Sequence, residues 1–229
     1  MFKLHQTTEY GNCWSISSDK FKVKHPGPSG GLSLVLYLEV ADYLKGLTTG
    51  HGARIQIQEQ RTYPFPTEEG LFIPASMETN IGLKMISISR QGGLYGDCND
   101  GKVLEKSSTY KYTRSACQSL CLTDKIMEMC RCYDERFEEL AMSKSNVLKS
   151  CRNHTEIKCM AELKRDFVMN EIHCTCFNPC SEVQYAKSVS QRQWPDEDYA
   201  MVLLQAICDK DSDECALLRG LIDEPAKLK

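Results

Sequence analysis

The chain has 229 residues, of which 41% are hydrophobic and 26% are charged, and these fractions exclude a disordered or collagen-like protein. Its formal charge is −3, from 28 basic and 31 acidic side chains, which argues against a nucleic-acid binder driven by counterion release. Thirteen cysteines in a chain of this length indicate an oxidising compartment with a disulfide framework, or bound metal. Because thirteen is odd, not every cysteine can find a partner within the chain.

The sequence contains no run of about 18 or more apolar residues, so no segment is predicted to span a membrane. The most apolar run, residues 32–41, is interrupted by Ser33 and Glu39. The first six residues have no apolar segment behind them, as a secretory signal would require. A cysteine-rich chain without such a signal is expected to be a piece of a longer secreted or membrane-anchored protein.

Residues 1–97 are predicted to be β-rich. Leucines at every second position from Leu32 to Leu38, followed by Val40, show the period of two expected of a strand. Apolar residues also alternate over 54–58 and over 81–88, where a change of parity indicates a β-bulge. Clusters of Pro and Gly at 26–31, and of Pro and aromatic residues at 63–66, predict turns or extended connections.

Residues 98–180 hold ten of the thirteen cysteines and are predicted to be helical. One helix carries Cys117 and Cys121 on a single face and begins at Thr113 or Ser115 as its N-cap. A second helix is predicted over 155–171. Its expected inward-facing residues are Ala161, Leu163, Phe167 and Val168.

Residues 181–229 are predicted to be extended at first and then helical, with helices starting near Asp196 and near residue 212. The chain is therefore predicted to be an α+β protein in three parts. These parts are β-rich (1–97), disulfide-rich and helical (98–180), and helical at the C-terminal end (181–229).

The cysteine spacing allows a helix to be joined to a neighbouring segment by two parallel bridges. Cys117 and Cys121 lie one turn apart on a helix, while Cys174 and Cys176 share one face of an extended segment. Two further cysteines, at 130 and 132, face those at 151 and 159 in the same nested manner. Spacing alone does not decide which cysteines pair.

The alternative to disulfides is zinc, for which the histidine and three cysteines of residues 173–180 offer ligands. The cysteine pairs lack the C-x2-C spacing that is typical of zinc sites, so disulfides are favoured. Asn153, His154 and Thr155 form an acceptor for N-linked glycosylation, which has a role only in the secretory pathway and adds modest support for disulfides because this tripeptide is common by chance.

Several short segments are recognisable when the chain is read in order. They are Gly11–Ser15, Gly31–Leu34, Gly52–Ile57, Gly70–Pro74, Gly93–Cys98, Cys117-x3-Cys121, Cys130-x-Cys132, Cys174-x-Cys176-x3-Cys180 and Trp194-Pro195. Together they resemble the extracellular region of the degenerin/epithelial sodium channel family, which includes the acid-sensing and peptide-gated channels. The resemblance covers residues 10–205, and Tyr95–Cys98 is most similar to the epithelial members.

The resemblance implies the architecture of this family's extracellular region. Residues 1–97 would supply part of an antiparallel β palm and β-ball, residues 98–180 a disulfide-stapled helical thumb, and residues 181–229 a helical knuckle. It also implies five bridges: Cys98–Cys180, Cys117–Cys176, Cys121–Cys174, Cys130–Cys159 and Cys132–Cys151.

Three cysteines remain outside this implied pattern. In the family, the position of Cys13 bonds to a cysteine shortly after the first transmembrane helix, so its partner is expected upstream of Met1 and outside this chain. Cys208 and Cys215 have no clear counterpart in the family. The six residues between them predict a local bridge.

By resemblance, the chain is the extracellular domain of a subunit of a trimeric, amiloride-sensitive-type sodium channel, on the outer face of the plasma membrane. It would transmit extracellular stimuli to the pore. The expected partners are identical or homologous subunits. The transmembrane helices, which this chain lacks, would contact the membrane, and the pore, which it also lacks, would conduct sodium ions. No enzymatic activity, cofactor, metal or nucleic-acid partner is expected.

Two alternatives stay open at this point. Tyr95 matches an aromatic position that, in the family, couples the thumb to the first transmembrane helix, but an aromatic residue beside glycines and a bridge can equally pack into a turn. The chain as a whole can instead belong to a secreted, soluble, disulfide-rich binding protein.

Overall fold

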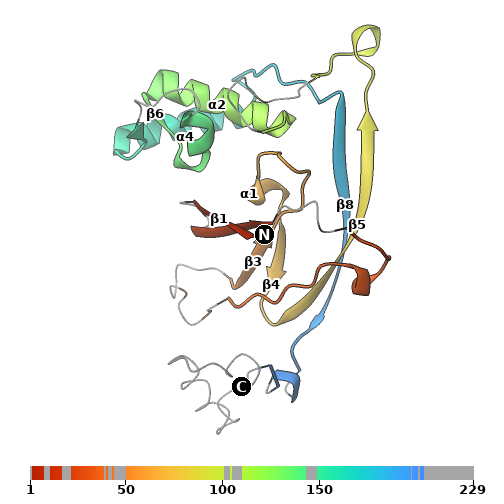
Figure 1. The fold of residues 1–229 in the computed structure, drawn as a ribbon. Coiled ribbons are helices and arrows are strands. Elements are labelled where there is room, and N and C mark those ends of the chain that lie inside the picture. Colours follow the sequence, from red (N-terminus) through yellow and green to blue (C-terminus); the bar gives the residue numbers. More distant parts are fainter. Residues whose placement is uncertain are drawn as a thin grey trace. The chain divides into compact units, whose positions relative to one another are not determined.

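The computed structural model describes residues 2–7, 11–16, 22–38, 40, 43, 50–100, 104, 110–142, 149–196, 198–200 and 202–203. Helices and mostly antiparallel strand pairs are mixed along the chain (Figure 1), in agreement with the predicted α+β class. The chain divides into two compact units. The first comprises residues 1–30, 57–65 and 84–186, and the second residues 31–56, 66–83 and 187–229.

The first unit begins with an antiparallel strand pair. Strand β1 (Phe2–Thr7) pairs with β2 (Gly11–Ile16), with Thr7 opposite Gly11 next to the connection and Phe2 opposite Ile16 at the far end. Leu4 lies opposite Trp14 in this register, and both side chains are exposed.

The helical part of the first unit is built around two long helices, α2 and α4 (Figure 1). Between them the chain forms short elements that place the two helices side by side. In order, the elements are α2 (Arg114–Cys130), β6 (Cys132–Tyr133), η4 (Glu135–Phe137), α3 (Glu138–Met142), β7 (Lys149–Ser150) and α4 (His154–Val168).

Both long helices begin at side-chain caps. Thr113 caps α2, because its hydroxyl oxygen accepts a hydrogen bond from the backbone N–H of Ala116 at 3.1 Å. Helix α2 ends at Arg131, whose left-handed backbone (φ 59°) turns the chain out of the helix. Asn153 caps α4 in a capping box with Glu156, so this helix starts slightly earlier than predicted.

Two apolar clusters form the core of the first unit. One surrounds the first half of α2 and contains Tyr63, Phe65, Leu104, Tyr112, Ala116, Leu120 and Leu140. The other lies between the second half of α2 and α4 and contains Ile126, Cys130, Cys132 and Leu163. Their burial supplies the hydrophobic part of the stability of this unit.

The inward face predicted for α4 is only partly correct. Leu163 is buried and Phe167 is half-buried, whereas Ala161 and Val168 are exposed. The reason is that α4 packs mainly against α2, so only a narrow stripe of its surface is covered.

A long two-stranded ribbon consists of β5 (Met77–Ser89) and β8 (Ser181–Gln193), seen side by side in Figure 1. The two strands are antiparallel, because the ion pair Arg90–Glu182 joins the end of β5 to the start of β8, while Glu78–Arg192 joins the start of β5 to the end of β8. Residues 84–89 and 181–186 of the ribbon belong to the first unit, and residues 77–83 and 187–193 to the second. Strand β5 contains the alternating stretch predicted over 81–88.

The second unit also contains β3 (Gly52–Ile55), which pairs antiparallel with β4 (Leu71–Pro74). The short helix α1 (Pro66–Glu69) precedes β4 and ends at Gly70, where an added Cβ would lie 2.4 Å from the carbonyl oxygen of Pro66. Only glycine fits this close turn. Strand β3 covers the first half of the segment predicted at 54–58.

The strand predicted from Leu32 to Val40 is wrong for the residues that the structure describes. Residues 32–38 form no strand, and Leu32, Leu34 and Leu36 are exposed. Alternation indicates which side chains share a face, but a strand also needs a neighbour for its backbone hydrogen bonds, and no described strand pairs with this segment.

The helix predicted to start near Asp196 begins there. The Asp196 carboxylate accepts a hydrogen bond from the backbone N–H of Tyr199 at 2.7 Å, and its carbonyl accepts one from Ala200. The helix predicted near residue 212, together with Cys208 and Cys215, lies outside the described residues.

Candidate functional site

Five disulfide bonds cross-link the first unit between residues 98 and 180. They join Cys98 to Cys180, Cys117 to Cys176, Cys121 to Cys174, Cys130 to Cys159, and Cys132 to Cys151. These are the same five pairs that the family resemblance implies, and their Cα–Cα distances lie between 5.0 and 6.2 Å, as disulfide geometry requires.

Two of these bonds attach one segment to α2 at neighbouring points. Cys117 and Cys121 are one helical turn apart and bind Cys176 and Cys174, respectively. A single bond would let the segment rotate about the attachment, but two bonds one turn apart prevent that rotation. The Tyr112 hydroxyl adds a third fastening by donating a hydrogen bond to the carbonyl of Phe177 at 2.8 Å.

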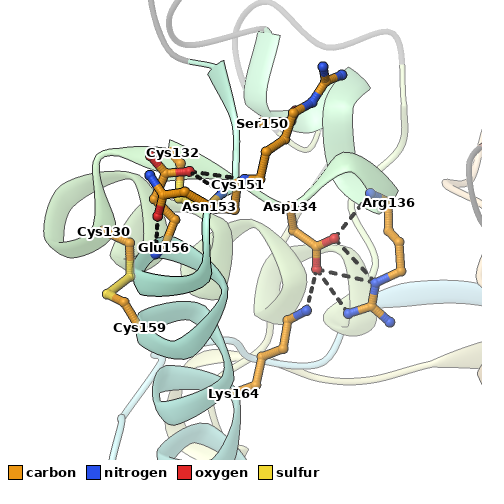
Figure 2. The surroundings of a disulfide bond; sticks show 11 residues. Cys130, Cys132, Asp134, Arg136, Ser150, Cys151, Asn153, Glu156, Cys159 and Lys164 are labelled. Atoms are coloured by element: carbon orange, nitrogen blue, oxygen red, sulfur yellow. Dashed lines mark hydrogen bonds and ion pairs between the residues drawn. A yellow bond between two sulfur atoms is a disulfide. The ribbon is translucent and has the colours of Figure 1, made fainter.

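Two more disulfide bonds lie at the C-terminal end of α2. Cys130, the last residue of α2, is bonded to Cys159 of α4, and Cys132 of β6 is bonded to Cys151 (Figure 2). Cys132 is almost fully buried and Cys130 is buried in the cluster between the helices. Helices α2 and α4 are therefore held together covalently as well as by packing.

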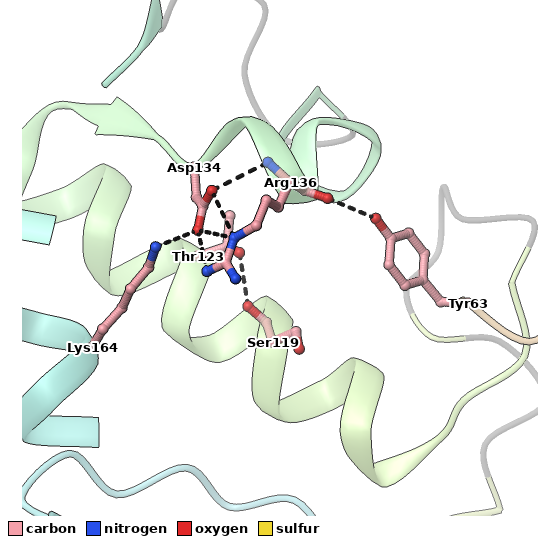
Figure 3. A network of polar contacts seen from close by, with 6 residues as sticks. All are labelled: Tyr63, Ser119, Thr123, Asp134, Arg136 and Lys164. Carbon is pink, nitrogen blue, oxygen red and sulfur yellow. Dashed lines mark hydrogen bonds and ion pairs between the residues drawn. The ribbon is translucent and has the colours of Figure 1, made fainter. Parts of the chain in front are cut away.

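A buried carboxylate forms ion pairs that connect α4 to the segment between β6 and η4 (Figure 3). The side chain of Asp134 is 7% exposed and accepts bonds from Lys164 of α4 at 2.7 Å and from the Arg136 guanidinium at 2.9 Å. Burial alone would raise the pKa of Asp134, but the bonds from Arg136 and Lys164 outweigh it and lower this pKa below its ordinary value. Asp134 is thus an ionised anchor.

Two tyrosines join residues 57–65 and 110 to the helical elements. Tyr63 donates a hydrogen bond from its hydroxyl to the carbonyl of Arg136 at 3.4 Å (Figure 3). Tyr110 donates to the Glu139 carboxylate at 2.5 Å, and its ring contacts that of Tyr63. Burial, followed by the nearby Glu139 carboxylate, raises the pKa of both tyrosines, so both remain protonated donors at neutral pH.

An exposed turn carries the aromatic residue singled out by the sequence. Residues Gly93–Tyr95 form one 3-10 turn (η3). The turn begins with Gly93 at φ 71° and is followed by Gly96 at φ 138°, and both conformations favour glycine. The side chain of Leu94 is 100% exposed and that of Tyr95 is 81% exposed. The alternative in which Tyr95 packs into the turn therefore does not hold in this structure.

Both ends of the turn are fixed to residues 178–182. Before the turn, Arg90 donates from its backbone to the carbonyl of Cys180 at 2.7 Å, and its guanidinium contacts the Pro179 carbonyl at 2.8 Å and Glu182 at 2.6 Å. After the turn, Cys98 is bonded to Cys180. The exposed turn thus stands on a fixed base.

The base of the turn is continuous with the doubly bonded segment. Only four positions separate Cys176, which is bonded to α2, from Cys180, which is bonded at the turn. Residues 174–180 therefore connect α2 to the turn that carries the exposed Leu94 and Tyr95, with disulfide bonds at Cys174, Cys176 and Cys180. We call this connection the disulfide-linked path.

The remaining predicted site residues lie apart from this path. Asn153 is exposed at the start of α4, and Cys13 is partly exposed in β2 opposite His5. The ten cysteines of the five bonds do not include Cys13.

Sequence reasoning missed Arg90 and Asp134. Asp134 stands in a charged run, residues 134–139, that is typical of a solvated helix face, so the sequence carries no signal of its burial. Arg90 follows a strand as an isolated cation, and its side-chain contacts come from Pro179 and Glu182, which lie 89 and 92 positions later in the sequence.

The described residues hold no group of three or more His, Cys, Asp or Glu side chains arranged to bind a metal ion. Within the same residues, no helix has the length and apolar character needed to cross a membrane.

Comparison with known proteins gives a consistent result. The family model for the amiloride-sensitive sodium channel matches residues 1–219. The chain is 34% identical over 194 residues to the epithelial sodium channel subunit alpha of Neoceratodus forsteri, covering 81% of this chain and 29% of that protein. It is 30% identical over 224 residues to degenerin mec-10 of Caenorhabditis elegans, covering 93% of this chain and 30% of the relative.

A third relative is the epithelial sodium channel subunit beta of Mus musculus, which is 29% identical over 231 residues, covering 93% of this chain and 35% of that protein. The chain therefore spans about a third of the length of the curated relatives that it matches.

Proposed function

We propose that this chain, which belongs to the amiloride-sensitive sodium channel family, forms part of the extracellular region of a plasma-membrane sodium-channel subunit. The family is one of ion channels and not of enzymes. On this proposal, the chain acts together with identical or homologous subunits, in a homo- or heterotrimer. Its role is mechanical: it carries an extracellular stimulus toward a pore formed by parts of the subunit beyond this chain.

The main support for the proposal is the disulfide-linked path, residues 174–180, which connects α2 to the exposed turn. A lever transmits movement only if it does not bend, and each bridge removes alternative conformations that would absorb the movement. Two bonds between α2 and residues 174–176, and one more at Cys180, leave little freedom along this path. The five bonds of the helical part fit the role of a stiff arm.

The turn at Gly93–Tyr95 fits the role of the contact that passes the movement on. Two large apolar side chains, Leu94 and Tyr95, are almost fully exposed at its tip. Exposed apolar side chains on a rigid base are typical of a surface that meets a partner. We propose that Tyr95 contacts the first transmembrane helix of the complete subunit.

Other features belong to the same proposal. Residues 1–97 correspond to palm and β-ball, residues 98–180 to the thumb, and residues 181–229 to the knuckle. Cys13 is proposed to bond with a cysteine that follows the first transmembrane helix.

The proposal is tested by recording sodium currents from the full-length subunit in oocytes, alone and with homologous subunits. Currents are measured with sodium substitution and an amiloride-type blocker, and the amount of subunit at the surface is measured by biotinylation. We expect Tyr95→Ala to change the blockable current per surface subunit at least threefold, and Tyr95→Phe to preserve it.

Tyr37→Ala is the matched control, because Tyr37 is 73% exposed but lies outside the turn. An unchanged current per surface subunit in Tyr95→Ala would refute the coupling role. A surface-expressed subunit that carries no sodium current in any of these combinations would refute the channel proposal itself.

A further inference from the structure

We propose that Asn153 carries an N-linked glycan and at the same time caps α4, and that the glycan faces solvent in the assembled protein. Asn153, His154 and Thr155 are the one Asn-x-Ser/Thr acceptor in the 229 residues. All three side chains are exposed. The acceptor is therefore on the surface of the first unit.

The two roles use different atoms of one side chain. The Oδ1 atom of Asn153 accepts a hydrogen bond from the backbone N–H of Glu156 at 2.8 Å, and this bond caps the helix (Figure 2). The glycan bond forms at the other terminal atom, Nδ2, replacing one of its two hydrogens. Glycosylation therefore leaves the capping acceptor in place.

The rest of the capping box depends mainly on backbone donors; the Asn153 side-chain amide adds a smaller contribution at Glu156, for which Nδ2 keeps one hydrogen after glycosylation. The Glu156 carboxylate accepts hydrogen bonds from the backbone N–H groups of Arg152 at 2.9 Å and Asn153 at 3.2 Å. These two bonds are the main reason that the pKa of Glu156 is lowered. The Glu156 carboxylate thus stays ionised, and the capping box stays intact when Asn153 is modified.

The position of the acceptor has a consequence for the assembled channel, and this step rests on the proposed function. The helix start is held in place by Cys132–Cys151 on one side and Cys130–Cys159 on the other. A bulky, strongly hydrated glycan on this fixed corner keeps a partner surface from packing on it. The N-terminal end of α4 is therefore free of subunit and membrane contacts.

The experiment expresses the full-length subunit in mammalian cells and follows its gel mobility before and after digestion with peptide-N-glycosidase. Wild type and Thr155→Ser keep the acceptor. Asn153→Asp removes the acceptor but keeps a capping oxygen, and Thr155→Ala removes the acceptor and leaves Asn153 untouched.

We expect wild type and Thr155→Ser to run one glycan slower than Asn153→Asp and Thr155→Ala, and this difference to disappear after digestion of denatured protein. Equal mobility of all four variants would overturn the modification, whether or not the subunit forms a channel. Surface channels digested without denaturation are expected to lose the same glycan. Loss only after denaturation would overturn the claim that this corner is uncovered in the assembly, while leaving the glycan itself established.

Discussion

Removing the two parallel bridges of α2 is expected to destabilise the protein more than the two single removals suggest. The perturbation is Cys117→Ser with Cys176→Ser, Cys121→Ser with Cys174→Ser, or all four substitutions together. While Cys121–Cys174 is intact, Cys117–Cys176 closes a loop of only eight residues, 117–121 and 174–176. Loop-closure entropy then gives about 2.5 kcal/mol for either single bridge.

The second removal costs more, because the remaining bridge closes a larger loop. Once Cys117–Cys176 is gone, Cys121–Cys174 closes residues 121–130 and 159–174, a loop bounded by Cys130–Cys159. That loop of 26 residues corresponds to about 3.5 kcal/mol. All four substitutions together should therefore cost about 6 kcal/mol, which is about 1 kcal/mol more than the two single removals combined.

The assay is urea unfolding of the secreted extracellular region, followed by circular dichroism of its helices. Without a parallel neighbour, Cys117–Cys176 would close the larger loop bounded by the other bridges, and its removal alone would cost about 3.5 kcal/mol. A cost of that size for Cys117–Cys176 alone, or a fourfold variant equal to the two single removals added together, would refute the parallel arrangement.

Two further substitutions test the anchors of α4. Asp134→Asn should cost about 2–3 kcal/mol, because Lys164 and Arg136 lose a nearly buried ionised partner but are themselves partly exposed and can be hydrated. Glu128→Gln, which removes an exposed ion pair with Lys125, should cost less than about 0.5 kcal/mol in the same urea titration, and equal costs would contradict the anchor role. Since the folded pKa of Asp134 lies below its ordinary value of 3.8, its contribution is fully present above about pH 4 and is lost as the pH falls through the folded pKa. The difference between wild type and Asp134→Asn should therefore shrink below pH 4, and a difference that grows there would show the opposite sign of coupling. Asn153→Ala should cost about 1 kcal/mol and Asn153→Asp close to nothing, although both lack the glycan acceptor, because only aspartate retains the capping oxygen; equal losses would contradict the cap.

Local chemistry made the helical part predictable from the sequence. The spacing of Cys117 and Cys121 requires only the helical period, and Thr113 as a cap requires only a hydroxyl before the helix. Which cysteines pair needed the resemblance to a family, because nested spacing permits several connectivities. The five implied pairs are present and α2 begins after its cap Thr113, whereas only part of the inward face predicted for α4 is buried.

Features that depend on distant neighbours were not predictable in this way. The alternation from Leu32 to Leu38 indicates a strand, but whether a strand forms depends on a partner whose position the pattern does not contain. Asp134 looks like one charge in a polar run, and only the packing of α4 brings Lys164 to it. Arg90 is positioned by residues 179–182, which are adjacent to it only in the folded chain.

A double-mutant cycle in channel currents tests the proposal that the disulfide-linked helices act on the pore through Tyr95. Amiloride-blockable current per surface subunit is measured for wild type, Tyr95→Ala, the Cys117→Ser/Cys176→Ser pair, and all three substitutions combined. If movement of α2 reaches the pore through Tyr95, removal of the bridge changes the current severalfold in wild type and has little further effect once Tyr95 is absent. The same fold-change in both backgrounds would show that the bridge and Tyr95 act independently, and would contradict the proposal.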